Sequence, residues 1–304
     1  MPGASAPPVE RHGRPRNGLR VARVVARDFD GHSETSLDPD LRVFVSDLAR
    51  PYGLELREDL LRRGVGHSYG EMAEELLAQA LPAGEPVDLL ILAFSSPDVR
   101  PGRSAAVHLS RFCPGAPLAF AVCDQGPAAA FTALRIASDY SRSGACRRAV
   151  VLAVEQTSLH HRPAAPVVLP DRHRAVALVC EQTDGDEALV RQSSGAVADS
   201  APAQVRSEWA ALGPQAALIS GPELALGPQA ALSGPEPERE AGLGRDPLGP
   251  VVEAGPGQPF TGVWTQLAER LPAWRAERRP VLVADLDRRL GRLSTLALPA
   301  GVAP

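Results

Sequence analysis

The sequence contains no lysine, because all 32 of its basic residues are arginine. Lysine forms Schiff bases with carbonyl substrates and binds phosphate in Walker-type loops, so both chemistries are excluded. Asparagine occurs only at Asn17, and no histidine follows His173. The second half of the chain therefore cannot supply a catalytic histidine or asparagine.

Strong charge and long apolar runs are also missing. The formal net charge is −4 over 304 residues, which gives no field that would recruit nucleic acid or an anionic membrane. We find no signal peptide and no apolar run of membrane length, so we expect a cytoplasmic protein. Four cysteines without CxxC spacing argue against zinc and against a disulfide framework, and we expect neither a metal nor a cofactor. They are Cys113, Cys123, Cys146 and Cys180.

Apolar patterning predicts an ordered N-terminal half at residues 20–182, which follows a disordered tail at residues 1–19. Residues 128–140 begin after Pro127 and are apolar almost all round, which is typical of a buried helix. Two more helices are expected at residues 69–81 and 104–112. The expected strands are residues 19–29, 87–94, 116–123, 149–154 and 175–180. The second and third of these are apolar enough to be buried.

Residues 183–257 have a different composition. They contain a 14-residue repeat, LGPQAALISGPELA followed by LGPQAALSGPEPER, among many proline and glycine residues. Two copies are too few for a solenoid, so we interpret the region as a low-complexity insert in a degenerate second half. Order is expected to return at residues 258–304, with a helix at 261–274 and strands at 281–284 and 293–298.

The most informative pattern lies in residues 87–155. The strand sequence VDLLILAF is followed by PLAFAVCDQG, the apolar stretch AAAFTALRIA, the small-residue turn SGA and the strand AVVLAVE. This pattern resembles the nucleophile-bearing half of ketosynthase III proteins in the thiolase superfamily. The resemblance implies an α/β, thiolase-like layered fold with mixed sheets and a buried central helix, here with a shortened second half. It also implies dimers that form across the strand at residues 116–123.

The nucleophile of that family is missing. The resemblance places the catalytic cysteine at Gly126 when the alignment starts from Ala119, or at Pro127 when it runs back from Leu134. Neither side chain can carry an acyl group. The family's condensing enzymes also use a histidine and an asparagine from the second half, which this chain lacks. Because decarboxylative condensation needs a thiolate and donors for an oxyanion, we expect no ketosynthase activity.

Two residues near the missing cysteine are candidate replacements. Cys123 ends a strand just before the central helix, and a helix N-terminus lowers a thiol pKa. It lies three residues too early, however, and a buried cysteine usually serves as a small hydrophobic residue. Gln125 resembles the glutamine that replaces the cysteine in chain-length factors, the inactive partners of type II polyketide ketosynthases. The same residue is equally consistent with hydrogen bonding in a turn.

Further polar candidates follow two of the strands. Glu155, His160 and His161 lie in the sequence EQTSLHHRP, where the carboxylate and one histidine are a candidate acid–base pair. A polar surface loop is the alternative interpretation. Ser95 follows the strand at residues 87–94, at the edge where α/β folds bind ligands, but no G-x-S-x-G motif surrounds it. We place Ser95, Gln125 and Glu155 around a substrate pocket.

These observations lead to two main hypotheses. In the first, the chain is an inactive ketosynthase-like subunit of acyl or polyketide biosynthesis that pairs with an active ketosynthase, with itself, or with an acyl carrier protein. In the second, it is an acyltransferase that uses acyl-CoA or acyl carrier protein without forming a C–C bond. The acyl group would be carried by Cys123 or transferred directly within the pocket, with His160 or His161 as the base. A decaying gene product is the third possibility, because the repeat occupies the segment expected to carry the catalytic histidine. The candidate contacts for an acidic carrier protein are Arg147, Arg148, Arg172 and Arg174.

Overall fold

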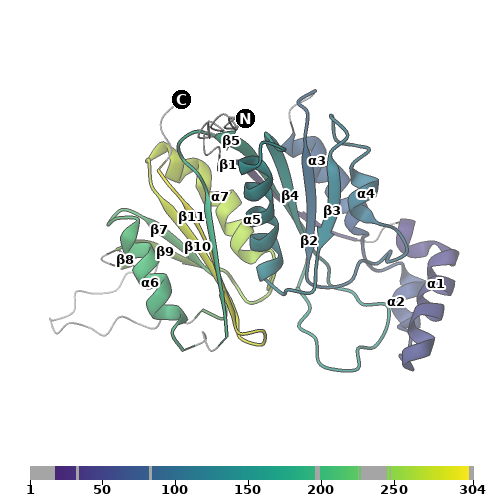
Figure 1. Ribbon diagram of the computed structural model, residues 1–304. Helices are drawn as coiled ribbons and strands as arrows, with labels where there is room; N and C mark the ends of the chain where they lie inside the picture. The colour runs from purple at the N-terminus through teal and green to yellow at the C-terminus, as the bar shows by residue number, and fades with distance from the viewer. Residues whose placement is uncertain are drawn as a thin grey trace, which may run out of the picture.

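The computed structural model describes residues 18–31, 34–81, 84–195, 199–224, 226, 245–246 and 248–300. Two mixed β-sheets enclose a pair of helices, and further helices cover the outer faces of both sheets (Figure 1). The predicted layered α/β architecture is therefore confirmed. Within the described residues, no helix combines the length and the apolar character needed to span a bilayer.

The first sheet has the strand order β1-β5-β4-β2-β3. Strand β2 runs parallel to β3 and β4, whereas β5 runs antiparallel to β4 and to β1. Its strands β2 and β4 are buried on both faces, which explains why their sequences are continuously apolar. The strands are β1 (Gly18–Phe29), β2 (Leu89–Phe94), β3 (Leu118–Val122), β4 (Arg148–Glu155) and β5 (His173–Thr183).

The second sheet repeats this topology with the order β6-β11-β10-β7-β9-β8. Strand β7 runs parallel to β9 and β10, and β11 runs antiparallel to β10 and to β6. Strands β10 and β11 of the second half thus correspond to β4 and β5 of the first. The strands are β6 (Leu189–Ser194), β7 (Ala217–Ser220), β8 (Arg245–Asp246), β9 (Gly249–Glu253), β10 (Val281–Asp287) and β11 (Arg292–Leu298).

One helix from each half fills the space between the sheets. These are α5 (Ala128–Arg142) and α7 (Gly262–Ala276), and both contact strands of both sheets. The rings of Phe131 and Trp264 join the two helices with their centroids 4.6 Å apart. Both side chains are fully buried, and the removal of such a ring from water contributes about 2–3 kcal/mol. The predicted buried central helix is confirmed, and α7 is its counterpart in the second half.

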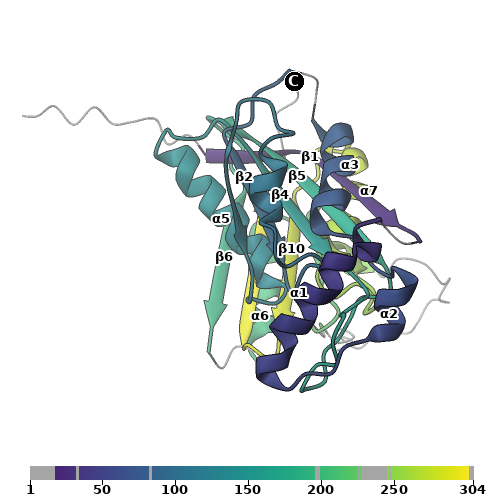
Figure 2. The ribbon, with the colours of Figure 1, turned by 90° about the vertical axis from the view of Figure 1, so that its right-hand side faces the viewer.

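The outer helices complete the layers. Helix α3 (Tyr69–Ala80) packs on the first sheet and begins with a capping box between Ser68 and Glu71, while α4 (Ala105–Leu109) lies beside it. Helix α6 (Ala201–Ala211) packs against β10 of the second sheet. Helices α1 (Pro39–Ala49) and α2 (Glu58–Arg63) stand outside the layers, on the face turned to the viewer in Figure 2. Two short 3-10 helices, η1 (Glu34–Leu37) and η2 (Arg50–Tyr52), flank α1.

Two sequence-based predictions need correction. Residues 183–257 are not merely an insert, because β6, α6, β7 and β9 lie within them and complete the second sheet. These elements are short and rich in alanine and polar residues, so their periodicity was too weak to identify. Strand β3 is not a buried strand either: it forms the edge of its sheet, and Leu118 is 52% exposed.

Some predictions fall outside the described residues. Residues 1–17 of the expected tail lie outside the described residues, while Gly18 and Leu19 already belong to β1. The first copy of the repeat contributes the whole of β7. Of the second copy, residues 226–239, only Leu226 is described. The expected domain boundaries at 182 and 257 stay predictions.

Candidate functional site

The turn that joins β3 to α5 leaves no room for a side chain at residue 126. Gly126 is buried and has a φ angle of +52°, in the left-handed region that favours glycine. A Cβ atom added there would overlap Oδ2 of Asp287 and would lie 3.7 Å from Cδ1 of Leu290. Pro127, the other position aligned with the family nucleophile, caps the start of α5. Neither position presents a reactive group.

The acidic residue that closes this turn comes from the second half of the chain. Asp287 ends β10, is only 8% exposed, and accepts a hydrogen bond from the Leu290 N–H at 2.8 Å. The turn between β10 and β11 thereby covers the start of α5. A carboxylate is favourable beside a helix N-terminus, because the exposed N–H groups there carry partial positive charge.

Glu155, from the first half of the chain, makes the corresponding contact at the start of α7 in the second half. It ends β4, the counterpart of β10, and its carboxylate is 2% exposed. Its Oε2 accepts from the Phe260 N–H at 3.1 Å, and its Oε1 accepts from the Thr261 N–H at 3.0 Å and from the Thr261 hydroxyl. Burial raises the pKa of Glu155 to about 7, although these hydrogen bonds and the Arg174 charge act to lower it. Each half of the chain thus places a carboxylate at the start of the other half's central helix.

Asp285 is a further acidic group that sequence patterns did not reveal. It lies on β10, is 3% exposed, and accepts from the Leu286 N–H at 2.9 Å. Burial raises the pKa of its carboxyl group well above the ordinary value. A Cβ atom on Gly221, just after β7, would overlap this carboxyl group, so only glycine fits there. An acidic residue in an otherwise apolar strand pattern was the available sequence signal.

The half-buried Gln125 side chain is hydrogen-bonded to other side chains of the fold. Its Oε1 accepts from the Thr132 hydroxyl at 2.7 Å and from Nη1 of Arg292 at 3.1 Å. The Thr132 hydroxyl also accepts from Nε2 of Gln192 at 3.0 Å. This network ties the turn before α5 to β6 and β11, so Gln125 links the two halves of the chain.

Cys123 lies half-buried just after β3, and its thiol donates to Oδ2 of Asp124 at 3.3 Å. Burial, together with the hydrogen bond and the negative charge of Asp124, raises the pKa of the Cys123 thiol. A nucleophilic cysteine requires the opposite shift. The environment therefore works against an acylated Cys123.

The two adjacent histidines point into different environments. His160 is buried, and its Nε2 lies 2.9 Å from the Val65 carbonyl oxygen. Burial lowers the pKa of His160. His161 is half-buried, and its backbone pairs with that of Leu56 in an isolated bridge. Both residues thus anchor the loop after β4 to the segment around α2.

Ser95 is exposed, whereas Glu155 is buried. Strand register pairs Phe94 with Val154, so the two residues leave neighbouring strands at the same edge of the sheet. The tie between these two loops is instead Gln156, whose Nε2 donates to the Pro97 carbonyl at 2.7 Å. Ser95, Gln125 and Glu155 thus differ in burial and in hydrogen-bond partners, and their grouping around one substrate pocket stays a prediction.

Searches of known protein families and of curated proteins find no match to this chain. Solved structures do match over nearly the full length. A 3-oxoacyl-(acyl-carrier protein) synthase from Burkholderia xenovorans has a TM-score of 0.60 and 14% identity, with 93% of this chain and 94% of that chain covered. The tetronic acid condensing enzyme AbyA1 has a TM-score of 0.58 and 16% identity, with 92% and 99% covered. Cerulenin-bound OleA from Xanthomonas campestris has a TM-score of 0.57 and 13% identity, with 93% and 98% covered.

The chain has a thiolase-like, ketosynthase III-type fold. The resemblance found in residues 87–155 is confirmed by these neighbours at the level of the fold. Their low sequence identity carries no residue roles to this chain, so its chemistry depends on its own side chains.

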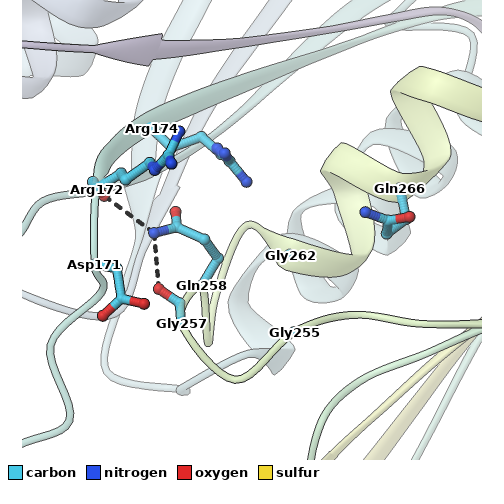
Figure 3. A pocket seen from close by; sticks show the side chains of 8 residues that line it. All are labelled: Asp171, Arg172, Arg174, Gly255, Gly257, Gln258, Gly262 and Gln266. Carbon is cyan, nitrogen blue, oxygen red and sulfur yellow. Dashed lines mark hydrogen bonds between the residues drawn. The ribbon is translucent and has the colours of Figure 1, made fainter.

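A cavity of about 180 Å³ opens beside the start of α7 in this thiolase-like fold (Figure 3). It lies between the beginning of β5 and the segment of residues 255–261, which we term the α7 lead-in loop. Gln258 of this loop donates from Nε2 to the carbonyl oxygens of Arg172 at 3.3 Å and Gly257 at 2.8 Å. The lining residues are Asp171, Arg172, Arg174, Gly255, Gly257, Gln258, Gly262 and Gln266.

Three of the four arginines expected to contact a carrier protein are already paired within the fold. Arg172 and Arg174 both bind Asp28, with Nη1 and Nη2 respectively 3.1 and 2.9 Å from its Oδ2. Arg148 pairs with Glu85 and Glu181. Arg172 and Arg174 share the one negative charge of Asp28, while Arg148 lies between two carboxylates, so the net positive charge of this group is reduced, which weakens the case for a basic docking surface.

Proposed function

We propose that this chain is a non-condensing, ketosynthase-like subunit of an acyl or polyketide biosynthetic system, and that it pairs with a catalytically complete ketosynthase. The observation that carries the proposal is the closed turn at Gly126, where Asp287 occupies the space that a nucleophilic side chain would need. A subunit with this turn cannot hold an acyl thioester there, and it retains a fold typical of condensing enzymes.

The N-terminus of the second central helix supports the same conclusion. The first N–H groups of a helix are natural donors for an oxyanion. Here Glu155 accepts from the N–H groups of the N-cap residue Thr261 and of Phe260 before it, so a carboxyl group of the protein already lies at the start of α7. The second half also contains no histidine and no asparagine. The chain thus lacks both the nucleophile and the usual means to stabilise an enolate.

The edge strand β3 is the expected contact with the partner subunit. It is joined to β2 on one side only in the described chain, and its residue Leu118 is 52% exposed. An exposed edge strand offers unpaired N–H and C=O groups to a second chain. Val107 in α4 and Phe112 just after it are 52% and 46% exposed, and α4 contacts β3. Together they supply an apolar surface that a partner would cover.

The alternative function, acyl transfer through Cys123, is disfavoured by the raised pKa of its thiol. The decisive measurement is the intact mass of the protein after incubation with a panel of acyl-thioesters, alone and with an active ketosynthase encoded nearby in the genome. We expect the partner to be acylated and this chain to remain unmodified. An adduct that maps to Cys123 and disappears in Cys123→Ala would overturn the non-catalytic assignment.

The partner contact has its own test. Light scattering after size-exclusion chromatography should show a one-to-one complex of the two proteins. Leu118→Glu should disrupt this complex, because it places a charge on the β3 edge. Leu189→Glu is the matched control, since Leu189 is a 40% exposed residue on β6, an edge strand of the other sheet. A stable homodimer that excludes the ketosynthase, or equal effects of the two variants, would contradict the proposed pairing.

A further inference from the structure

The Thr261 hydroxyl lies between two acceptors that compete for its single proton. Its oxygen is within hydrogen-bonding distance of Oε1 of Glu155, and it lies 3.3 Å from Oε1 of Gln258. A hydroxyl group can donate only one hydrogen bond at a time. The state of Glu155 therefore decides which of the two acceptors the hydroxyl can serve.

An ionised Glu155 can only accept hydrogen bonds. It therefore accepts one from the Thr261 hydroxyl, in addition to those from the Phe260 and Thr261 N–H groups. A neutral Glu155 carries its own O–H, which donates to the Thr261 oxygen. The Thr261 hydroxyl then keeps its proton but donates its hydrogen bond to Oε1 of Gln258 instead. Protonation of the buried Glu155 carboxyl group thus changes the hydrogen bonding of Gln258 through the Thr261 hydroxyl, without any proton moving to Gln258.

Gln258 carries the effect to the surface. Its other end, Nε2, bridges the carbonyl oxygens of Arg172, just before β5, and of Gly257, in the loop itself; both residues line the cavity (Figure 3). The Asp171 N–H completes the connection by donating to the Gly257 carbonyl at 2.7 Å. The α7 lead-in loop also contains Gly255, Pro256 and Gly257 within the sequence GPGQP, so its conformation depends on such contacts rather than on a regular element.

Charged groups on the surrounding elements act on Glu155 from several sides. Arg174 on β5 favours its ionised form. Asp285 on β10 is close enough for the two negative charges to repel, and the Tyr69 hydroxyl on α3 lies within the same electrostatic range. Burial is the largest influence, and it brings the pKa of Glu155 to about 7, so both protonation states are populated near neutral pH.

We propose that Glu155, Thr261 and Gln258 form a proton-controlled switch that sets the conformation of the α7 lead-in loop and, through it, the shape of the adjoining cavity. The switch is independent of the proposed partner role, because it depends only on contacts within one chain. It makes the cavity between β5 and α7 responsive to pH in the neutral range.

Nuclear magnetic resonance of the ¹⁵N-labelled full chain between pH 5.5 and 8.5 tests this switch. In the native protein, the Phe260 backbone amide and the Gln258 side-chain amide should shift together, with one midpoint near 7. Glu155→Gln should abolish both shifts. Thr261→Val should retain the shift at Phe260, which contacts Glu155 directly, and should abolish the shift at Gln258.

Two further variants separate the switch from other causes. Thr261→Ser keeps the hydroxyl and should restore the Gln258 shift, which distinguishes loss of the relay from loss of packing or folding. Asp171→Asn removes a titratable group that lines the same cavity and should leave both shifts unchanged. The proposal is overturned if the native protein shows no shared midpoint, if Glu155→Gln keeps the shifts, or if Gln258 still titrates in Thr261→Val.

Discussion

Substitution of Gly126 by alanine tests the central geometric claim most directly. Two costs add at this position. A residue with a Cβ atom in the left-handed region of backbone φ and ψ angles destabilises the folded state by about 1–2 kcal/mol. Displacement of the Asp287 carboxylate from the Leu290 N–H removes a buried hydrogen bond to a charged group, worth about 1.5–3 kcal/mol. We therefore expect Gly126→Ala to lower the free energy of unfolding by about 3–5 kcal/mol.

Urea denaturation of a double-mutant cycle separates the two costs. In an Asp287→Ala background the overlap is gone, so Gly126→Ala should cost only about 1–2 kcal/mol. Gly144→Ala is the matched control, because Gly144 also has a positive φ, +82°, while nothing lies within 4 Å of its added Cβ atom. The reasoning is refuted if Gly126→Ala costs no more than Gly144→Ala, or if the cycle shows no coupling with Asp287.

Three further outcomes can be measured. Burial raises the pKa of Glu155 in the folded state to about 7, above its ordinary value of 4.5, so the folded chain binds this proton more tightly than the unfolded chain. The free energy of unfolding should therefore fall by about 3 kcal/mol as the pH rises from 4.5 to 7. Urea denaturation midpoints should show this pH dependence, and Glu155→Gln should remove it. Iodoacetamide should alkylate Cys123 slowly because burial, and then Asp124, raise the pKa of its thiol. Peptide mapping should find a faster reaction in Asp124→Asn, and an unchanged rate would contradict the contribution of Asp124. Arg174 lowers the pKa of Asp28 below its ordinary value of 3.8, so Asp28→Asn should cost about 1 kcal/mol at pH 7. That difference should begin to shrink as the pH falls below 3.8 and should be lost once the pH is below the lowered pKa of the folded state; a difference that stays undiminished at about pH 2 would speak against an ionic origin.

Much of the fold was predictable because its signal is local. A continuous apolar run identified β2, which is covered on both faces, whereas the similar run at residues 116–123 is the partly exposed edge strand β3. The apolar helix after Pro127 was recognised as α5 for the same reason, since a helix without a polar face must be buried. The sequence was less informative for β6, α6 and β7, which are short and carry mixed polar and small residues. These elements are stabilised by their neighbours in the second sheet, and no local pattern records those neighbours.

The candidate site shows the same division. The count of residues alone excluded a catalytic cysteine, histidine and asparagine arrangement, because side chains that are absent cannot be assembled by any fold. The roles of the residues that are present depended on contacts between distant segments. Glu155 became the anchor of α7, which begins more than 100 positions later in the chain, with its hydrogen bonds to Phe260 and Thr261 at sequence separations of 105 and 106.

Gly126 and Asp287 make the point most clearly. The sequence by itself determined that no nucleophile stands at the start of the central helix. Only the tertiary structure decided what stands there instead, because the carboxylate that fills the turn arrives from the end of β10 in the other half of the chain. Backbone geometry at residue 126 is a local property, whereas the occupant of the space beside it is set by how two repeated halves pack face to face.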